Sequence, residues 1–449
     1  MRDMRLDQRE IAETTQATAH DAARPKALVV VSLWPDRNGT GTQRRAFQHL
    51  WCLAHVYDID LIVQPRRQRE RQAHDGLVSL CRNVIELPVA RDYVLAVDRY
   101  QTPGFTLLCE MYRGWRKQWR PYAKKQRLQA LVSLARRLNG PYELQFFFRL
   151  DTTWLRTALV TFGDSQTRYV IDLDDLDSSY IRQAAHVNAS LLGRELVLAM
   201  QLRAQWLQRI EKRLLRSFDI ATFASIADLA RVAGYRPTAQ VSVLMNSVPL
   251  VAQPLEPRVA DGAYRLLFVG LMAYVPNADA AVFLAREIVP LIRSTLGPRI
   301  ELFLVGKEPP PTVTALDHPP QINVTGWVED LLPYYRDADL VVMPIRMGSG
   351  TRIKAIEALN LGRPIVSTTL GVEGLGLIPG RHILIADSAE GIAAACCRLL
   401  TDPALRAELV ANGREKVKTD LGYEQALATL MKLLGRSADP LSMPRDPWL

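Results

Sequence analysis

The sequence predicts an α/β protein in which two open, mostly parallel sheets follow each other along the chain, each covered by helices. Its 449 residues are enough for two or three domains of about 100–200 residues. Short apolar segments alternate with longer helical patterns in both halves, which is typical of strand–helix–strand units in a parallel sheet. The segment 249–262 holds three prolines between the two series and is typical of a linker.

The composition excludes several classes of protein. With 48% hydrophobic and 23% charged residues, the chain as a whole is not collagen-like, disordered or coiled-coil. It has no run near the roughly 18 apolar residues of a membrane span. Its polar segment 1–25, which we expect to be a disordered tail, lacks the apolar centre of a secretory signal. Five cysteines without metal-site spacing argue against a disulfide framework. We expect a soluble, cytoplasmic protein.

The first domain, 26–248, begins with the apolar segment Ala27–Leu33, which is typical of a buried strand. A loop with two glycines, Asn38–Thr42, leads into a helix, and Ile59–Val63 completes a strand–helix–strand unit. A helical pattern without proline covers Ser178–Arg216. The other predicted strands of this domain are 143–148, 168–173, 220–223 and 241–244.

The second domain, 263–420, repeats the alternation of strands and helices. We expect the last segment, 421–449, to form a helix and tail that pack back toward the first domain. Two such domains leave a cleft where the ends of their strands meet, the usual place for a ligand. The predicted strands are 265–270, 300–306, 324–326, 340–344, 364–368 and 383–386, and the predicted helices are 277–293, 329–336, 352–361 and further helices to about residue 434.

The net charge of +9 is concentrated in one segment, Arg113–Arg137, which contains no acidic residue. Its aromatic residues, three or four apart, would form one stripe on a helix. Three interpretations stay open: an anionic membrane surface, a solvated helix whose aromatics pack on the domain, or nucleic acid. We favour the membrane surface, at the inner face of the plasma membrane, and expect no nucleic-acid partner. The basic residues are Arg113, Arg116, Lys117, Arg120, Lys124, Lys125, Arg127, Arg136 and Arg137, and the aromatic ones are Tyr112, Trp115, Trp119 and Tyr122.

A glycine-bearing loop in the second domain stands between a predicted strand and a predicted helix. Gly348-Ser-Gly350 would let the backbone approach a ligand, and the free amides at the helix start favour phosphate. Arg352 and Lys354 add two cations to the first turn, where the helix dipole disfavours them unless an anion is bound. Glu357 can share the face of Lys354 and suits the hydroxyls of a ribose. The alternative is an ordinary surface ion pair between Lys354 and Glu357.

Four aspartates lie at the end of a predicted strand of the first domain. Asp172 with Asp174, and Asp175 with Asp177, have a spacing that suits Mg²⁺ or Mn²⁺ on a nucleoside diphosphate. The glycine amides and two cations of the second domain suit the same phosphates, so we expect no obligate metal. Two interpretations remain: one acid acts on the acceptor or in catalysis, or the group is a turn and a helix N-cap around Asp177 and Ser178.

A series of motifs follows the order of elements in the second domain: Phe268-Val-Gly-Leu-Met272 with Pro276-Asn277, Gly326-Trp-Val-Glu-Asp330, Ala338-Asp-Leu-Val-Val-Met-Pro344, Gly350-Thr-Arg-Ile-Lys354, Glu357-Ala358, Gly362-Arg-Pro-Ile-Val-Ser-Thr368 and Glu373-Gly374. In order and spacing they resemble the C-terminal domain of family 4 glycosyltransferases. The resemblance implies the GT-B fold, in which two Rossmann-like domains face each other across a cleft. It also implies retaining transfer of a sugar from a nucleotide sugar.

The resemblance implies a role for each matching position. Arg352 and Lys354 would hold the donor diphosphate and act in catalysis, and Glu357 would hold the ribose. The backbone at Trp327 and Val328 would contact the base. The other donor-site positions are Gly270, which would let its loop approach the donor, and Gly348, Ser349, Gly350 and Thr351.

The chain departs from the family pattern at two positions. Many members have a second glutamate eight residues before the ribose-binding one, where this chain has Ser349. The way in which the sugar hydroxyls are bound is therefore not carried over. Many members also have a histidine near the reacting centre, where this chain has Asp174, and we keep Asp174 as a candidate catalytic residue. Asn246 resembles the interdomain asparagine of the family, or belongs to an ordinary turn.

The loop Gly39-x-Gly41 in the first domain suggests a dinucleotide fingerprint, but Arg44 stands in place of the third glycine, and a lone pair of glycines is a weak signal. We interpret it as backbone that lines the cleft near the transferred sugar or the acceptor. Arg44 and Arg45 would contact an anionic acceptor or face solvent.

These observations predict a glycosyltransferase that moves a sugar from a nucleotide-diphosphate sugar to a glycan, a lipid-linked or another hydroxyl acceptor, in polysaccharide or glycoconjugate biosynthesis. We expect no cofactor besides this co-substrate and no obligate metal. The alternatives are a non-catalytic GT-B scaffold that acts as a membrane or nucleic-acid adaptor, and a nicotinamide-dependent oxidoreductase, which the missing third glycine disfavours.

Overall fold

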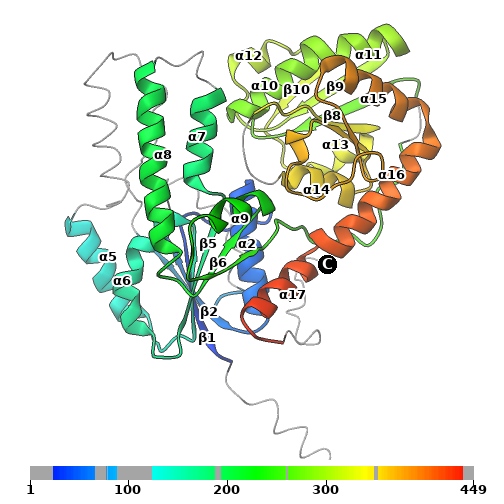
Figure 1. The fold of residues 1–449 in the computed structure, drawn as a ribbon. Coiled ribbons are helices and arrows are strands. Elements are labelled where there is room, and N and C mark those ends of the chain that lie inside the picture. Colours follow the sequence, from blue (N-terminus) through cyan, green and yellow to red (C-terminus); the bar gives the residue numbers. More distant parts are fainter. Residues whose placement is uncertain are drawn as a thin grey trace, which may run out of the picture.

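The computed structural model describes residues 24–65, 77, 79–87, 124–187, 194–258, 261–347 and 352–437. Within these residues the strands form two sheets, one in each half of the chain, with helices packed around them (Figure 1). The pairings between their strands are parallel. In both sheets the first strand lies inside, with the next two on one side and the later ones on the other. This order is that of doubly wound Rossmann-like domains, so the predicted α/β class with two such domains is confirmed.

The first sheet has the order β3-β2-β1-β4-β5-β6-β7. Its central strands are near-continuous apolar runs because helices bury both faces. The sequence analysis does not predict β3, which is short and begins and ends with polar residues. The strands are β1 (Lys26–Val31), β2 (Asp58–Val63), β3 (Asn83–Glu86), β4 (Leu144–Phe148), β5 (Arg168–Asp174), β6 (Ile220–Phe223) and β7 (Gln240–Val243).

The second sheet has the order β10-β9-β8-β11-β12-β13. Its strands agree with the predicted segments within a few residues at each end. They are β8 (Tyr264–Val269), β9 (Ile300–Val305), β10 (Ile322–Gly326), β11 (Leu340–Met343), β12 (Ile365–Ser367) and β13 (Leu384–Ile385).

The helices of the first half include the long pair that the sequence predicts over 178–216. This pair is α7 (Asp177–Val187) and α8 (Arg194–Leu214), and the residues between them lie outside the described part of the chain. The other helices are α2 (Gly41–Ala54), α5 (Lys124–Arg137), η3 (Leu150–Leu155), α6 (Arg156–Leu159), η4 (Val160–Phe162) and α9 (Ile226–Ala233).

In the second half a long helical segment follows β8, and three helices end the described chain. Cys396 is buried in α15 and Cys397 beside it is half-buried. The helices are α10 (Val275–Phe283), η5 (Leu284–Ile288), α11 (Val289–Leu296), α12 (Pro311–Thr314), α13 (Leu332–Asp337), α14 (Ile353–Asn360), η6 (Leu370–Val372), α15 (Ala389–Thr401), α16 (Pro403–Lys416), η7 (Val417–Leu421) and α17 (Tyr423–Leu433).

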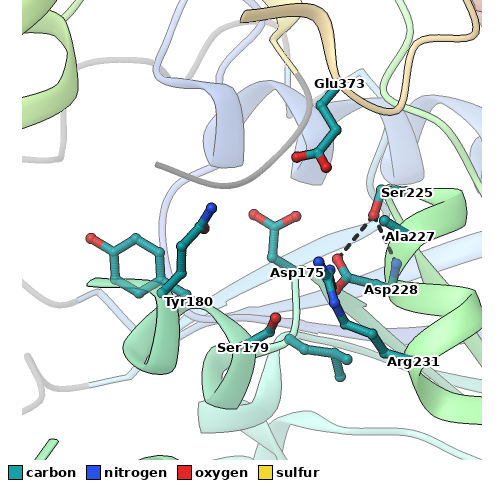
Figure 2. A pocket seen from close by; sticks show the side chains of 10 residues that line it. Asp175, Ser179, Tyr180, Ser225, Ala227, Asp228, Arg231 and Glu373 are labelled. Carbon is teal, nitrogen blue, oxygen red and sulfur yellow. Dashed lines mark hydrogen bonds and ion pairs between the residues drawn. The ribbon is translucent and has the colours of Figure 1, made fainter. Parts of the chain in front are cut away.

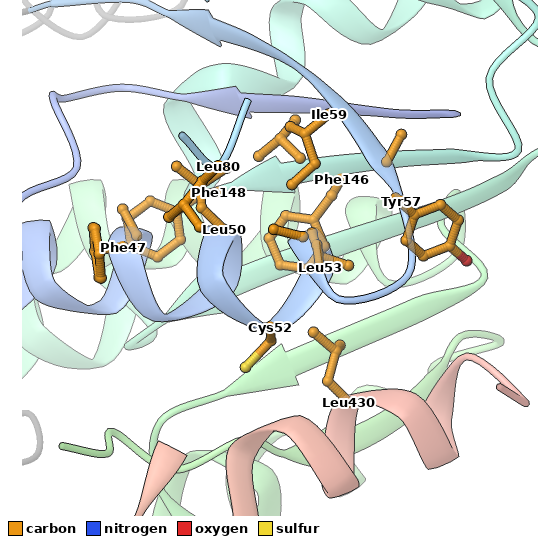
Figure 3. Packing of buried hydrophobic residues seen from close by; sticks show 14 of the residues in the cluster. Phe47, Leu50, Cys52, Leu53, Tyr57, Ile59, Leu80, Phe146, Phe148 and Leu430 are labelled. Carbon is orange, nitrogen blue, oxygen red and sulfur yellow. The ribbon is translucent and has the colours of Figure 1, made fainter. Parts of the chain in front are cut away.

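The core of the first domain includes a helix from the far end of the chain. Leu50 and Leu53 on α2 pack against Phe146 and Phe148 of β4, and Leu430 of α17 belongs to the same buried cluster (Figure 3). Figure 1 shows α17 beside α2, below the second domain. The last described helix thus packs on the first domain rather than on the second.

The chain crosses between the two domains twice, and the two crossing segments lie side by side. Val248 and Gly422 form a parallel bridge. The Val248 amide donates to the Leu421 carbonyl at 3.0 Å, and the Tyr423 amide donates to the Val248 carbonyl at 3.1 Å. Because the passages are hydrogen-bonded to each other, a movement of one domain against the other has to bend both at this point.

The basic segment of the sequence lies largely outside the described residues. Positions 113–123 are not described, and α5 begins at Lys124. Arg136 and Arg137 in its last turn are exposed. None of the described helices is both long enough and apolar enough to span a bilayer.

We expect Leu430→Ala to lower the free energy of unfolding by about 2–5 kcal/mol, because it leaves a cavity beneath α2 where the side chain is 0% exposed. Leu202→Ala, on the exposed side of α8, is the matched control and should change it by less than about 0.5 kcal/mol. Urea denaturation followed by circular dichroism measures both. Equal effects of the two substitutions would show that α17 does not contribute to the core of the first domain.

Candidate active site

The helices α2 and α14, one from each domain, begin at facing positions of a cleft. Each starts after the carboxyl end of a central strand, and this edge of a doubly wound sheet is where ligands bind. The Ile353 Cδ1 atom lies 3.7 Å from where a Cβ atom on Gly41 would be. The predicted loop of the first domain, at Gly39 and Gly41, therefore lies against the first turn of α14.

Lys354 lies in the first turn of α14 and points toward the loop after β8. Its Nζ donates to Asn277 Oδ1 at 2.8 Å and lies 5.0 Å from the centre of the Phe268 ring. Burial and, less strongly, the nearby Arg352 guanidinium lower the pKa of Lys354 to about 7, against the opposing effect of Glu357. An ammonium that is costly to charge in the free protein is stabilised when an anion binds beside it.

Arg352 immediately precedes α14 and is only 8% exposed. Its Nε atom is buried without a hydrogen-bond partner among the described residues. The guanidinium interacts with Tyr274, whose pKa is raised to about 12, first by burial and then by the neighbouring Tyr180, against the opposing effect of Arg352. A buried guanidinium with unused donor capacity suits a hydrogen-bond acceptor such as a phosphate oxygen.

Gly270 leaves the backbone beside these two cations without a side chain. A Cβ atom there would lie 2.9 Å from Asn277 Cγ and 3.0 Å from Lys354 Nζ, closer than packing allows. Gly306, with a φ of +155°, packs behind it, where a Cβ atom would overlap the Gly270 carbonyl. Gly306 requires glycine because the loops after β8 and β9 pass each other in direct backbone contact, and a side chain on Gly270 would displace Asn277 and Lys354.

Glu357 forms an ion pair with Arg44 of the first domain, whereas Lys354 donates to Asn277, so the alternative of a surface pair between Lys354 and Glu357 is not observed. Arg44 also donates through Nε to the Gly39 carbonyl at 3.0 Å. Burial lowers the pKa of Arg44, but the charge and hydrogen bond of Glu357 raise it more, so the net shift is upward. This ion pair links the two domains directly across the cleft.

Trp327 follows β10 and presents an open aromatic face. Its side chain is 62% exposed, and Lys307 Nζ lies 5.7 Å from its ring centre. Val328 beside it is half-buried. The positions Gly348, Ser349, Gly350 and Thr351, which the resemblance places at the donor, lie outside the described residues.

Arg45 does not contact an acceptor or face solvent, contrary to the sequence expectation. It is fully buried and donates to both oxygens of Asp172, at 2.9 and 2.7 Å. Its Nη1 donates to Asn246 Oδ1 at 3.0 Å, so Asn246 lies in a buried contact beside the domain boundary and not in an ordinary exposed turn. Burial alone would raise the pKa of Asp172, but Arg45 and His49 hold it well below its usual range.

Some aspartates of the predicted series form buried structural contacts, and others lie at the cleft. Besides the contacts from Arg45, Asp172 accepts from Thr222 Oγ1 at 2.5 Å and from the Asp174 amide at 2.9 Å. Asp174 is buried at a φ of +61°, with its carboxylate 3.5 Å from Arg45 Nε. Among the described residues no group of three histidine, cysteine or acidic side chains is arranged to hold a metal ion.

Asp177 and Ser178, at the start of α7, form hydrogen bonds with other side chains of the first domain. Asp177 accepts from Arg149 Nη2 at 3.1 Å. Ser178 donates to Glu211 on α8 through both its amide and its hydroxyl, at 2.9 and 2.5 Å. These contacts fix the start of α7 and leave Asp175 as the aspartate of the series that lines the cleft.

A pocket opens at this point between the two domains (Figure 2). Residues at the starts of α7 and α9 form its floor and sides, and Glu373 reaches in from the second domain. Sequence reasoning names the aspartate series but does not single out Asp175, and it finds Glu373 only as part of a motif. The lining residues are Asp175, Leu176, Ser179, Tyr180, Gln183, Ser225, Ala227, Asp228, Arg231 and Glu373.

Comparison with solved structures shows which fold the two domains form. Sucrose-phosphate synthase from Thermosynechococcus elongatus superposes with a TM-score of 0.63 at 18% identity, over 91% of this chain and 98% of that one. HepE from Anabaena, in complex with UDP and glucose, gives 0.57 at 11% identity over 92% and 99%. WaaG, a glycosyltransferase involved in lipopolysaccharide biosynthesis, gives 0.56 at 14% identity over 91% and 100%. The predicted GT-B fold is therefore confirmed.

The sequence comparison concerns the second domain. No curated protein matches the chain. Residues 263–402 match the family model described as "Glycosyl transferases group 1". This segment contains Gly270, Arg352, Lys354 and Glu357, while the narrower assignment to family 4 stays a prediction. The second domain is therefore similar in sequence to group 1 glycosyl transferases, and the two domains together have the GT-B fold.

Proposed function

We propose that the protein transfers a sugar, with retention, from a nucleoside-diphosphate sugar held by the second domain to a hydroxyl acceptor held by the first. The observation that carries this proposal is the pair of cations at the start of α14, the buried Arg352 and the half-buried Lys354, beside Gly270, which has no side chain. A diphosphate would satisfy the free Arg352 donor and would stabilise the charge of Lys354.

The same cations account for catalysis. As the bond between the sugar and the diphosphate breaks, negative charge grows on the leaving group. Donors fixed in a buried position before the reaction stabilise this charge without reorganisation, which is the largest contribution in many enzymes. The helix dipole at the start of α14 acts in the same direction.

The ribose and the base would lie along the carboxyl edge of the second sheet. Glu357 would accept from the ribose hydroxyls, so donor binding has to share or open its ion pair with Arg44. The exposed face of Trp327 lies beside the backbone proposed to contact the base. The structure of HepE contains UDP, and a uridine nucleotide is therefore the first donor type to test.

The acceptor, the pathway and the location remain proposals from the sequence. A glycan or lipid-linked acceptor in polysaccharide or glycoconjugate synthesis fits the predicted activity, and flotation with anionic liposomes tests the membrane prediction for Arg113–Arg137. A non-catalytic scaffold and an oxidoreductase are the competing functions. Incubation with a panel of nucleotide sugars, following release of the nucleoside diphosphate, separates all three.

We expect Lys354→Ala to lower kcat by about 10²–10³ with a smaller effect on donor affinity, because the lost charge acts mainly on the departing diphosphate. Glu357→Gln should raise the donor KM with less effect on kcat, because the ribose does not change charge during the reaction. Steady-state kinetics on the active nucleotide sugar measures both, with circular dichroism as the folding control.

Lys432→Ala, an exposed substitution on α17, is the matched control for the loss of a positive charge and should leave both constants unchanged. If folded Lys354→Ala keeps the turnover of the unsubstituted enzyme, Lys354 does not stabilise the leaving group.

We expect activity to survive dialysis against EDTA. The diphosphate charge would be neutralised by Arg352 and Lys354, and the oxygens of Asp172 are already bonded to Arg45 and Thr222. Turnover before and after chelation is the measurement. Complete loss of activity that Mn²⁺ or Mg²⁺ restores would instead favour a metal-bound diphosphate.

A further inference from the structure

The pocket between the starts of α7 and α9 is a second polar site, distinct from the two donor-side cations. It lies where β5 and β6 end, at the carboxyl edge of the first sheet. Figure 2 shows Asp175 at its centre, with its carboxyl group turned toward Glu373 of the opposite domain. The two carboxyl groups therefore face the same space from the two sides of the cleft.

Asp175 has hydrogen-bonding capacity that the protein does not use. Its Oδ1 atom is buried and has no hydrogen-bond partner among the described residues. Buried polar atoms are almost always satisfied, so an unpaired one that lines a pocket indicates a partner supplied by a ligand.

The other charged groups on the α9 side of the pocket are already paired. Asp228 forms an ion pair with Arg231 at 2.8 Å and accepts from the Ser225 hydroxyl at 3.0 Å. The pocket therefore presents carboxyl groups without a free cation among its described lining residues. Because none of these lining residues offers a free cation to pair with them, phosphate and carboxylate ligands bind weakly in such a site, whereas carboxyl groups on two sides suit the hydroxyls of a sugar.

The pocket is connected to the donor side through two tyrosines. Tyr180 lines the pocket and interacts with Tyr274, which in turn interacts with the Arg352 guanidinium. A ligand in the pocket would thus lie next to the proposed diphosphate site, where an acceptor has to be for transfer.

We propose that an uncharged, hydroxyl-rich carbohydrate unit of the acceptor lies across the mouth of this pocket and places one hydroxyl in it, and that Asp175 is a specificity-determining residue that hydrogen-bonds to this hydroxyl. The proposal rests on the proposed function and names the acceptor class. Glu373 contacts the same unit from the second domain, so the site is complete only when the domains face each other as they do here. An anionic acceptor group at this position would lie beside the carboxyl group of Glu373 with no free cation among the described residues that line the pocket, and would bind more weakly.

The protonation of Asp175 supplies the hydrogen bond. Burial, together with the carboxylates of Asp174 and Asp228, raises its pKa to about 8. At neutral pH the group is therefore protonated and can donate to a sugar oxygen. As the pH rises through about 8 it loses this donor and becomes an anion. The groups that face it from the surrounding elements are Asp174, Asp228, Arg231, Tyr180 and Glu373, with Arg149 and Arg45 opposing the rise.

The test measures binding directly, on the full chain saturated with UDP. Saturation-transfer NMR reports the affinity of methyl glycosides of glucose, galactose, mannose and N-acetylglucosamine, and of the 6-phosphates of the same sugars. We expect at least one neutral glycoside to bind, and its 6-phosphate to bind at least about tenfold more weakly. Binding of none of the neutral glycosides, or equal binding of a phosphate, overturns the proposal.

Substitutions of Asp175 then test whether this residue forms the hydrogen bond to the glycoside. We expect Asp175→Ala to weaken glycoside binding about tenfold, the value of one hydrogen bond of about 1.4 kcal/mol. Asp175→Asn keeps a donor and should bind within about threefold at pH 7. Between pH 7 and 9 the unsubstituted protein should lose affinity, and Asp175→Asn should not. Asp337→Asn, exposed at the end of α13, is the matched control and should retain the pH dependence.

UDP affinity, measured by calorimetry on each variant, separates this proposal from the proposed function. Failure of the unsubstituted protein to bind any nucleoside diphosphate would contradict the proposed function itself. Retained UDP binding with unchanged glycoside binding in Asp175→Ala, or the same pH dependence in Asp175→Asn, would overturn the role of Asp175 alone.

Discussion

The buried contact between Arg45 and Asp172 is the interaction on which the geometry of the cleft depends. Removing one partner would leave an unpaired buried charge, a change that typically costs about 3–5 kcal/mol. The pair fixes the start of α2 to the end of β5, and the same guanidinium reaches Asn246 beside the domain boundary. It thereby holds the turn in which Asp174 adopts a positive φ, and the turn places Asp175 at the pocket.

The two domains contribute different chemistry to one cleft. The second domain presents one buried and one half-buried cation beside glycine backbone, which suit a diphosphate. The first domain presents carboxyl groups, which suit hydroxyls. The Arg44–Glu357 ion pair and the tyrosine contact between Tyr180 and Tyr274 cross between them. Since both chain passages meet at Val248 and Gly422, domain movement is confined to one place and would change the donor and acceptor sides together.

Much of the fold can be predicted from the sequence because strands buried on both faces are uninterrupted apolar runs. The donor-side residues can also be predicted from the sequence, since Arg352, Lys354 and Glu357 lie within one short motif. The strand β3 is missed because it has only one buried residue. The burial of Arg45 and the pairing of Arg44 are missed because their partners, Asp172 and Glu357, lie 127 and 313 residues away in the sequence and only the folded chain joins them.

The central claim is that the cations at the start of α14 hold the diphosphate of a nucleotide. The most direct measurement is a crystal structure of the protein grown with UDP. We expect the diphosphate oxygens to lie within hydrogen-bonding distance of Arg352 and Lys354, about 2.7–3.2 Å, with the ribose at Glu357. A nucleotide bound with its phosphates elsewhere in the cleft, away from both cations, would contradict this claim.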